Sequence, residues 1–291
     1  MDQGLVLYQQ SDWYDSQPLL EIAAEAGDKE AQYYLGEAIR LSKRYMTVEA
    51  QRWYEAAAKQ GDLFAMLRLG NSDDLCHTLG TCAVSAPEWR EKALELAYER
   101  AEKGDTEAMR ALFHAGEGLV WLEKAAEAGD RYAQQHLASL YKAGEGWFLI
   151  PCNREKAIEK WLKASAEAGF PLGMMEYAHV LGYQNRVEEA KIWIQRSAEG
   201  GYVEAVYSYA SYLAHMPDKV GYSRDLVKSY ALFYLMSQLQ GGGGVAEDAR
   251  RKIKNVEALM SMEQVEEAEV FAEEWAKTHP PLSYFVPVYG Y

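Results

Sequence analysis

The sequence predicts an all-α solenoid, in which pairs of antiparallel helices stack along the chain. Three recurring patterns support this fold class. A short phrase, Ala-Ala-Glu-Ala-Gly at residues 125–129, returns along the chain. A large apolar residue stands eight positions before the glycine of each copy. Small, large and small residues follow the glycine at the fourth, eighth and ninth positions. Repeats of this kind pack on their neighbours, so we expect a repeat protein rather than a compact enzyme.

The repeated phrase predicts a tight turn between two helices. Asp130 follows the clearest copy, and related copies end at Gly27, Gly61, Gly169 and Gly201. A shortened copy ends at Gly104 and a degraded one at Gly241. Alanines allow two helices to approach closely, and a glycine just past a helix end adopts the left-handed conformation that stops the helix. We therefore interpret the phrase as structural.

The helix before each phrase carries a broad buried stripe. The residues eight positions before the glycines are Leu19, Trp53, Leu96, Trp121, Trp161, Trp193 and Phe233. Residues at this spacing share one face of a helix with the alanines of the phrase. A tryptophan at one repeating position is therefore interpreted as a packing residue and not as part of a ligand site.

In chain order, we predict four segments. Residues 1–17 form an N-terminal leader, in which Leu5–Tyr8 resembles the end of a helix, and residues 18–259 form the solenoid, from Pro18 onward. Residues 260–278 form a C-terminal capping helix that begins with the capping box Ser261–Gln264. Residues 279–291 form a tail rich in proline and aromatic residues. The interruptions at 71–87, 144–152 and 215–225 are expected to be surface loops.

The repeat unit resembles the Sel1-like repeat family, relatives of the tetratricopeptide repeats. The resemblance is carried by Ala-x-x-Trp followed by Ala-Ala-x-x-Gly-Asp-x-x-Ala-x-x-x-Leu-Gly, and it covers residues 18–277. The copy at 93–116 lacks the tryptophan, and the copy at 225–250 keeps only Phe233 and Gly241. The resemblance implies a right-handed superhelix and a protein-binding role as adaptor, regulator or inhibitor. Some members of the family are bacterial immunity proteins that neutralise lipase effectors of contact-dependent (type VI) secretion.

Charge and hydropathy restrict the class of partner. Asp and Glu outnumber Lys and Arg by 44 to 30, which gives a net charge of −14. This balance argues against nucleic acid or an anionic membrane and is compatible with a basic protein, although solubility alone also explains it. No stretch is long and apolar enough for membrane insertion. No signal peptide opens the sequence, so we expect the bacterial periplasm if one was trimmed, and otherwise the cytoplasm.

The sequence shows no catalytic or metal-binding motif, and we expect neither enzymatic activity nor a cofactor. Six histidines are scattered without the i, i+4 pairing of helical zinc sites. Three cysteines are present, of which Cys76 and Cys82 flank a short stretch. They form either a small disulfide in an oxidising compartment or two free thiols in the cytosol.

Candidate protein-binding residues come from three sets. The polar arc of the first helices holds Arg52, Glu55, Glu95, Glu123, Lys160 and Gln195. A stripe of glutamates two positions before the glycines holds Glu102, Glu127, Glu167 and Glu199. The stripe is either a binding surface or simply Glu serving as an exposed helix former. The tail contributes Tyr284 and Tyr289. It either packs along its own chain, which we favour, or meets a partner.

Our working hypothesis is an inhibitor or immunity protein that binds a basic effector. The alternative is an assembly or signalling adaptor without inhibitory activity. The sequence leaves the oligomeric state open.

Overall fold

The computed structural model describes residues 1–71, 85–218 and 220–289. Cys76 and Cys82 lie outside these residues. All regular elements in the described ranges are α-helices, joined by short turns, and the one strand-like pairing there is an isolated bridge between Tyr202 and Ser283. The predicted all-α fold class is therefore confirmed. No helix in the described part of the chain is long and apolar enough to cross a membrane.

The chain folds as two compact units. Unit 1 comprises residues Met1–Ala133 together with Val286–Tyr291, and unit 2 comprises Gln134–Phe285. The division falls inside helix α10, and the chain returns to unit 1 at Val286. The last residues of the chain thus belong to the unit that the first residues build.

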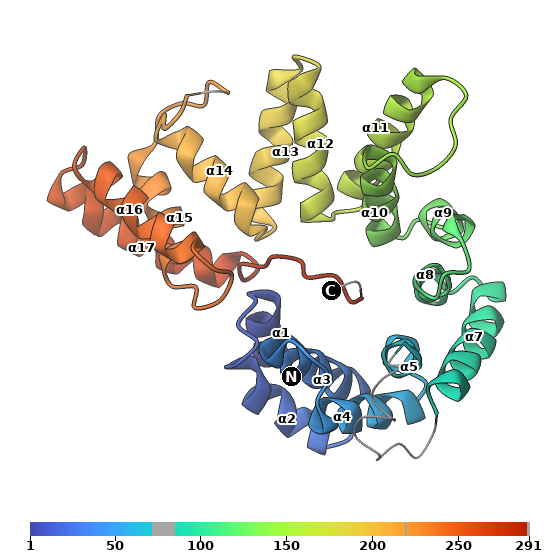
Figure 1. The fold of residues 1–291 in the computed structure, drawn as a ribbon. Helices are drawn as coiled ribbons and strands as arrows, with labels where there is room; N and C mark the ends of the chain where they lie inside the picture. Colours follow the sequence, from blue (N-terminus) through green and yellow to red (C-terminus); the bar gives the residue numbers. More distant parts are fainter. Residues whose placement is uncertain (72–84, 219, 290–291) are drawn as a thin grey trace. The chain divides into compact units, whose positions relative to one another are not determined.

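Unit 1 is a run of helices in which each described helix packs on the next (Figure 1). The helices are α1 (Asp2–Gln9), α2 (Ser16–Glu25), α3 (Lys29–Lys43), α4 (Val48–Lys59), α5 (Leu63–Gly70), α7 (Ala86–Glu102), α8 (Thr106–His114) and α9 (Leu119–Glu127). Helix α5 packs on both α7 and α8, and α3 packs on α1, α2 and α4. Helix α3 is buried from several sides as a result.

Helix α1 occupies half of the segment expected as a leader. It packs against α2 and α3, and its Tyr8 side chain has no exposed surface. Gly4 allows the close approach, because a Cβ there would stand 2.9 Å from Cγ of Leu20. Helix α2 begins at Ser16, two residues before Pro18. The packed N-terminal helix therefore extends the solenoid to the first residues of the chain.

The repeated phrase forms the predicted turn in six copies. Gly27, Gly61, Gly104, Gly129, Gly169 and Gly201 all have φ between +82° and +92°. Around Gly129, its own N–H donates to the Ala126 carbonyl and the Asp130 N–H donates to the Ala125 carbonyl, at 3.1 and 3.0 Å. This is the Schellman arrangement, which satisfies the last carbonyls of a helix.

The residue after the glycine starts the next helix. In the first four copies it is aspartate, whose carboxylate accepts from a backbone N–H of the following turn, as Asp130 does from Ala133 at 2.8 Å. Phe170 and Tyr202 replace it in the next two, where no side-chain cap is present. The degraded copy differs, because left-handed φ values there occur at Gly242 and Gly243.

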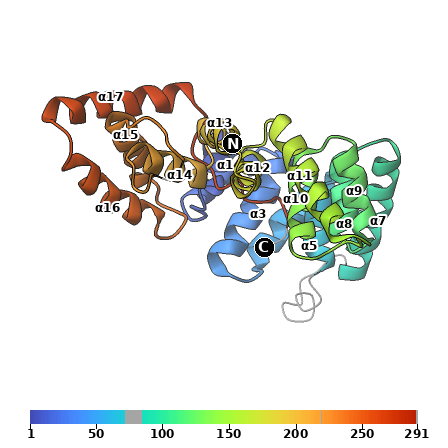
Figure 2. The same cartoon turned by 90° about the horizontal axis from the view of Figure 1, so that it is seen from above.

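Unit 2 continues the pattern and ends in the predicted capping helix. Its elements are most of α10 (Arg131–Lys142), then α11 (Pro151–Glu167), α12 (Pro171–Tyr183), α13 (Val187–Glu199), α14 (Val203–Leu213), α15 (Leu226–Ser237), α16 (Val245–Glu257) and α17 (Met262–Thr278). Helix α17 packs on α15 (Figure 2), and Ser261 and Gln264 form the expected capping box. Helix α17 thereby covers one side of α15.

The tail packs on its own chain, as favoured from the sequence. In unit 2, Ser283 donates its N–H to the Gly201 carbonyl at 2.9 Å and accepts from the Val203 N–H at 3.1 Å. The Phe285 ring lies 5.5 Å from that of Phe170 and 6.0 Å from that of Tyr202. Gly201 is required for two reasons. Its φ of +83° is left-handed, and a Cβ there would stand 2.6 Å from the Pro281 carbonyl oxygen.

Candidate functional site

The most unusual feature of unit 1 is a carboxylate buried in helix α3. Glu37 is 1% exposed and lies within the fully buried stretch 31–39. The stretch is buried because α3 packs against α1, α2 and α4. A charged group removed from water needs opposite charge and hydrogen bonds around it.

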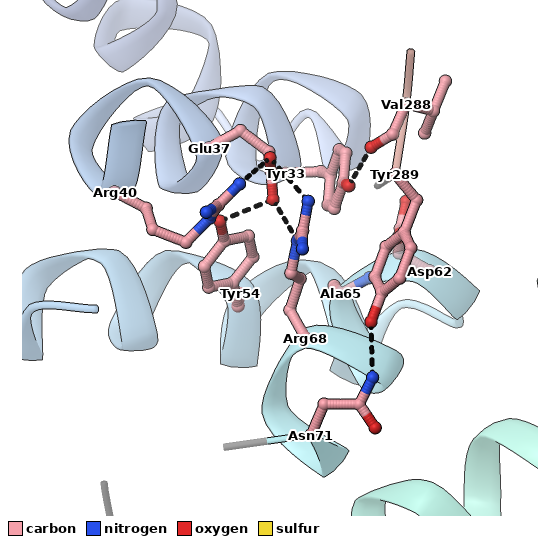
Figure 3. A network of polar contacts seen from close by, with 10 residues as sticks. All are labelled: Tyr33, Glu37, Arg40, Tyr54, Asp62, Ala65, Arg68, Asn71, Val288 and Tyr289. Carbon is pink, nitrogen blue, oxygen red and sulfur yellow. Dashed lines mark hydrogen bonds and ion pairs between the residues drawn. The ribbon is translucent and has the colours of Figure 1, made fainter. Parts of the chain in front are cut away.

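Two arginines and a tyrosine satisfy Glu37 (Figure 3). Arg68 of α5 makes a bidentate contact, with Nε 2.6 Å from Oε1 and Nη2 3.0 Å from Oε2. Arg40, one turn further along α3, donates Nη2 to Oε2 at 2.8 Å. The Tyr54 hydroxyl of α4 donates to Oε1 at 2.7 Å. The carboxylate therefore ties α3, α4 and α5 together.

The cluster carries more positive than negative charge, because two guanidiniums share one carboxylate. Burial and the neighbouring Glu37 raise the pKa of the Tyr54 and Tyr33 hydroxyls well above the usual value. Both tyrosines are therefore neutral donors at physiological pH. Burial acts to lower the pKa of Arg68, but the Glu37 carboxylate more than offsets this and raises it. Both arginines stay charged.

The last described residues of the chain dock beside this cluster. Gln9 of α1 donates Nε2 to the Val286 carbonyl at 3.3 Å, and the Tyr33 hydroxyl of α3 donates to the Val288 carbonyl. Val286 is buried. We call Val286–Tyr289 the docked segment. Two of its backbone carbonyls are thus held by side chains from two different helices.

Tyr289 fills an aromatic slot. The Arg68 guanidinium lies 4.1 Å from the centre of its ring, and the rings of Phe64 and His114 lie 6.0 and 5.1 Å away. Asn71 donates Nδ2 to the Tyr289 hydroxyl at 2.6 Å (Figure 3). A cation over an aromatic face contributes about 0.5–2 kcal/mol, and a neutral hydrogen bond about 1 kcal/mol. Tyr289 is therefore the main anchor of the docked segment.

We define the tail-docking site as the side chains of unit 1 that hold this segment: Gln9, Tyr33, Phe64, Arg68, Asn71 and His114. They come from α1, α3, α5, the residue after α5, and α8. In this structure the site contacts two backbone carbonyls and one aromatic side chain of the chain's own tail. No cluster of His, Cys, Asp and Glu able to hold a metal ion occurs among the residues that the structure describes.

The fold has a solved counterpart. A protective antigen of uropathogenic Escherichia coli that displays an SLR (Sel1-like repeat) fold matches 91% of this chain with a TM-score of 0.53 and 20% sequence identity. The chain has the Sel1-like repeat fold. It spans 56% of the length of that antigen. A Sel1 repeat protein from Oxalobacter formigenes matches 90% of this chain and 79% of its own, with 24% identity and a TM-score of 0.49.

Sequence comparison alone does not reach this result. The sequence matches no protein-family model and no curated protein. The resemblance read from the phrase is confirmed at the level of the Sel1-like repeat fold.

The two basic residues among the predicted protein-binding residues each lie over a tryptophan ring. The Arg52 guanidinium is 5.1 Å from the Trp53 ring, and Lys160 Nζ is 4.0 Å from the Trp161 ring. Both cations are exposed, while Trp53 and Trp161 are buried. The two tryptophans are packing residues as predicted, and each cation lies over the ring of one.

The predicted glutamates and glutamine are spread over both units. Glu55 accepts from Gln51 at 3.0 Å, and Gln195 donates to Glu199 at 2.8 Å. Within the stripe, Glu102 and Glu127 lie in unit 1, whereas Glu167 and Glu199 lie in unit 2. The exposed members of the whole set are Glu95, Glu102, Glu127 and Glu167, and the half-buried ones are Glu55, Glu123, Gln195 and Glu199. These side chains are therefore divided between the two units.

The two tail tyrosines have different surroundings. Tyr289 fills the slot described above. Tyr284 stays in unit 2, where its hydroxyl lies 3.5 Å from the Gly242 carbonyl. Both contact their own chain in this structure.

Arg68 of the tail-docking site and Glu37, which holds Arg68 in place, were not singled out from the sequence. Two signals were available. Glu37 follows the buried Leu35-Gly36 pair of its repeat, and Arg68 is the single charged residue of the apolar segment LFAMLRLG. A charge inside a buried stripe requires a partner, and this rule points to both residues.

Proposed function

We propose that the chain is a protein-binding scaffold that takes up an extended segment of another protein. The observation that supports it is the docked segment, which unit 1 holds through backbone carbonyls and one aromatic side chain. Stacked helical repeats create extended surfaces that repeat proteins use for binding.

The finer proposal is an inhibitor that covers a basic effector, as an immunity protein does. The net charge of −14 supports a basic partner, because opposite charge speeds encounter and selects partners. The exposed glutamates near the helix ends add to this charge in both units. An inhibitor must be in the same compartment as its toxin, so this proposal places the protein wherever the effector acts.

The test is co-purification with the tagged full chain, followed by an activity or toxicity assay of the captured protein. We expect one basic partner whose toxicity falls when the chain is added in equal amount. Capture of no effector, together with unchanged survival of sister cells after gene deletion, would remove the inhibitor proposal. Several captured proteins of modest affinity without toxicity would favour the adaptor alternative.

A further inference from the structure

The docked segment has the features of a bound ligand rather than of a structural element. It belongs to no helix, and its backbone contacts in unit 1 are made by side chains of Gln9 and Tyr33. Its side-chain contacts with named groups of unit 1 are concentrated on the half-buried Tyr289 ring. By contrast, Ser283, three residues before it, pairs backbone to backbone with Gly201 and Val203 in unit 2. The segment could leave its site without breaking any of those backbone pairs.

We infer that Val286–Tyr289 is a built-in competitor of the tail-docking site, and that a partner binds there with an extended segment of the same chemistry. This inference rests on the proposed function and names its site. The partner segment places a tyrosine in the Phe64–Arg68–His114 slot. One residue earlier, it presents a backbone carbonyl to Tyr33.

The contacts define this specificity. The slot has two aromatic walls and a guanidinium at ring distance, so it selects an aromatic ring. Asn71 lies at the end of the slot and donates to a hydroxyl at 2.6 Å, so tyrosine is preferred over phenylalanine. The residue before the tyrosine contacts Tyr33 through its backbone carbonyl, as Val288 does, so this contact does not select a side chain.

Occupation by the chain's own segment weakens binding of any partner segment. An intramolecular ligand acts at a high effective concentration, and the apparent affinity falls with the fraction of open sites. Substituting Tyr289 removes the ring contacts and the Asn71 bond, so it opens the site in the full-length chain. It leaves the described residues of the tail-docking site unchanged.

The experiment measures binding of the labelled peptide acetyl-Phe-Val-Pro-Val-Tyr-amide, the sequence of residues 285–289, by fluorescence anisotropy. We expect the Tyr289→Ala chain to bind it at least tenfold more tightly than the wild-type chain. The matched control is Tyr284→Ala, which removes a tail tyrosine that contacts Gly242 in unit 2, and it should bind like wild type. Equal affinity of the wild-type and Tyr289→Ala chains, with both folded by circular dichroism, would overturn the inference.

A second measurement tests the slot itself. On the Tyr289→Ala chain, a peptide ending in phenylalanine should bind several-fold more weakly than the tyrosine peptide. With Asn71→Ala added, the two peptides should bind equally, because the hydroxyl has lost its donor. Asn71 is exposed, so this variant does not depend on core packing. A tyrosine preference that persists in the Asn71→Ala chain contradicts the assignment.

Light scattering tests whether the site is instead filled by the tail of a second copy of the chain. A wild-type monomer supports the intramolecular assignment, whereas a wild-type dimer that Tyr289→Ala converts to monomers overturns it. The pull-down keeps the two proposals apart. A partner captured equally by wild-type and Tyr289→Ala chains leaves the scaffold function standing and removes this inference. Tight peptide binding by the Tyr289→Ala chain without any captured partner supports the tail-docking site for the chain's own segment but counts against the scaffold function and the partner.

Discussion

Glu37 determines how the polar core of unit 1 is arranged. Its two oxygens are shared among Arg40, Arg68 and Tyr54, which come from three helices. Because Arg68 is held on one side by Glu37, its guanidinium is fixed in place to face the Tyr289 ring on the other. The buried ion pair therefore positions part of the tail-docking site.

We predict that Glu37→Gln destabilises the protein by about 3–5 kcal/mol, because it leaves two guanidiniums in the core without a countercharge. Urea unfolding followed by circular dichroism measures this loss. The control is Glu30→Gln on the exposed side of the same helix, which should change stability by less than about 0.5 kcal/mol. Similar losses in both variants would show that the network is not needed for stability.

Asp62 predicts a pH dependence of stability. Burial raises the pKa of this N-cap carboxyl from 3.8 to about 6, although its hydrogen bond from Ala65 acts to lower it. The folded state then binds more protons than the unfolded state between these two pH values. The contribution of Asp62 to the free energy of unfolding therefore decreases as pH rises, by on the order of 3 kcal/mol from pH 3.8 to above 6.

Asp62→Asn should remove this decrease, since asparagine caps a helix as well as aspartate does but carries no charge. Urea unfolding at pH 4.5 and pH 7.5 should show the variant gaining on wild type as pH rises. A stability difference between the two chains that stays constant with pH would contradict the predicted ionisation.

Among the turns between helices, the glycines of the phrase differ in what a side chain would disturb. Gly169 has φ of +82°, and a Cβ there would meet no neighbouring atom within 4 Å, so its only requirement is conformational. Gly201 has φ of +83°, and a Cβ there would stand 2.6 Å from the Pro281 carbonyl oxygen. In unit 2, the tail therefore packs directly against the turn at Gly201.

This pair gives a matched prediction within one unit. Gly169→Ala should cost about 1–2 kcal/mol for the left-handed backbone alone. Gly201→Ala should cost a further 1–3 kcal/mol or so, because the tail must move. Thermal unfolding measures both, and hydrogen exchange at the Ser283 N–H should rise only in Gly201→Ala. An equal loss of stability in the two variants would mean that moving the tail away from residue 201 costs no measurable free energy.

At the scale of the whole molecule, charge is the property that the partner meets first. The excess of acidic over basic residues gives the chain a net charge of −14. Long-range attraction of this kind acts on the association rate and is screened by salt.

For a basic effector we predict that the association rate constant falls at least tenfold between 20 mM and 300 mM NaCl, while the dissociation rate changes little. Stopped-flow or surface-based kinetics with the purified partner measures both rates. A salt-insensitive association rate would instead favour the adaptor alternative.

Several elements followed from local sequence. The phrase predicted the Schellman turns at Gly27 through Gly201, and Ser261 with Gln264 predicted the start of α17. These features depend on residues within a few positions of one another, so sequence carries them directly. The network around Glu37 joins residues from three helices, so local sequence marks Glu37 and Arg68 as charges in apolar stripes but does not show that they pair with each other.

The all-α repeat fold, the turns and the packing role of the tryptophans could therefore be predicted from the sequence. The burial of Glu37 with Arg68 and the contacts of Tyr289 could be found only in the folded chain. Helix caps and stripes arise from short-range geometry, whereas the pairing of Glu37 with Arg68 and the docking of Tyr289 on residues more than 170 positions earlier depend on how the helices stack. Stacking brings distant residues together, and this is the reason the candidate site became visible only in the folded chain.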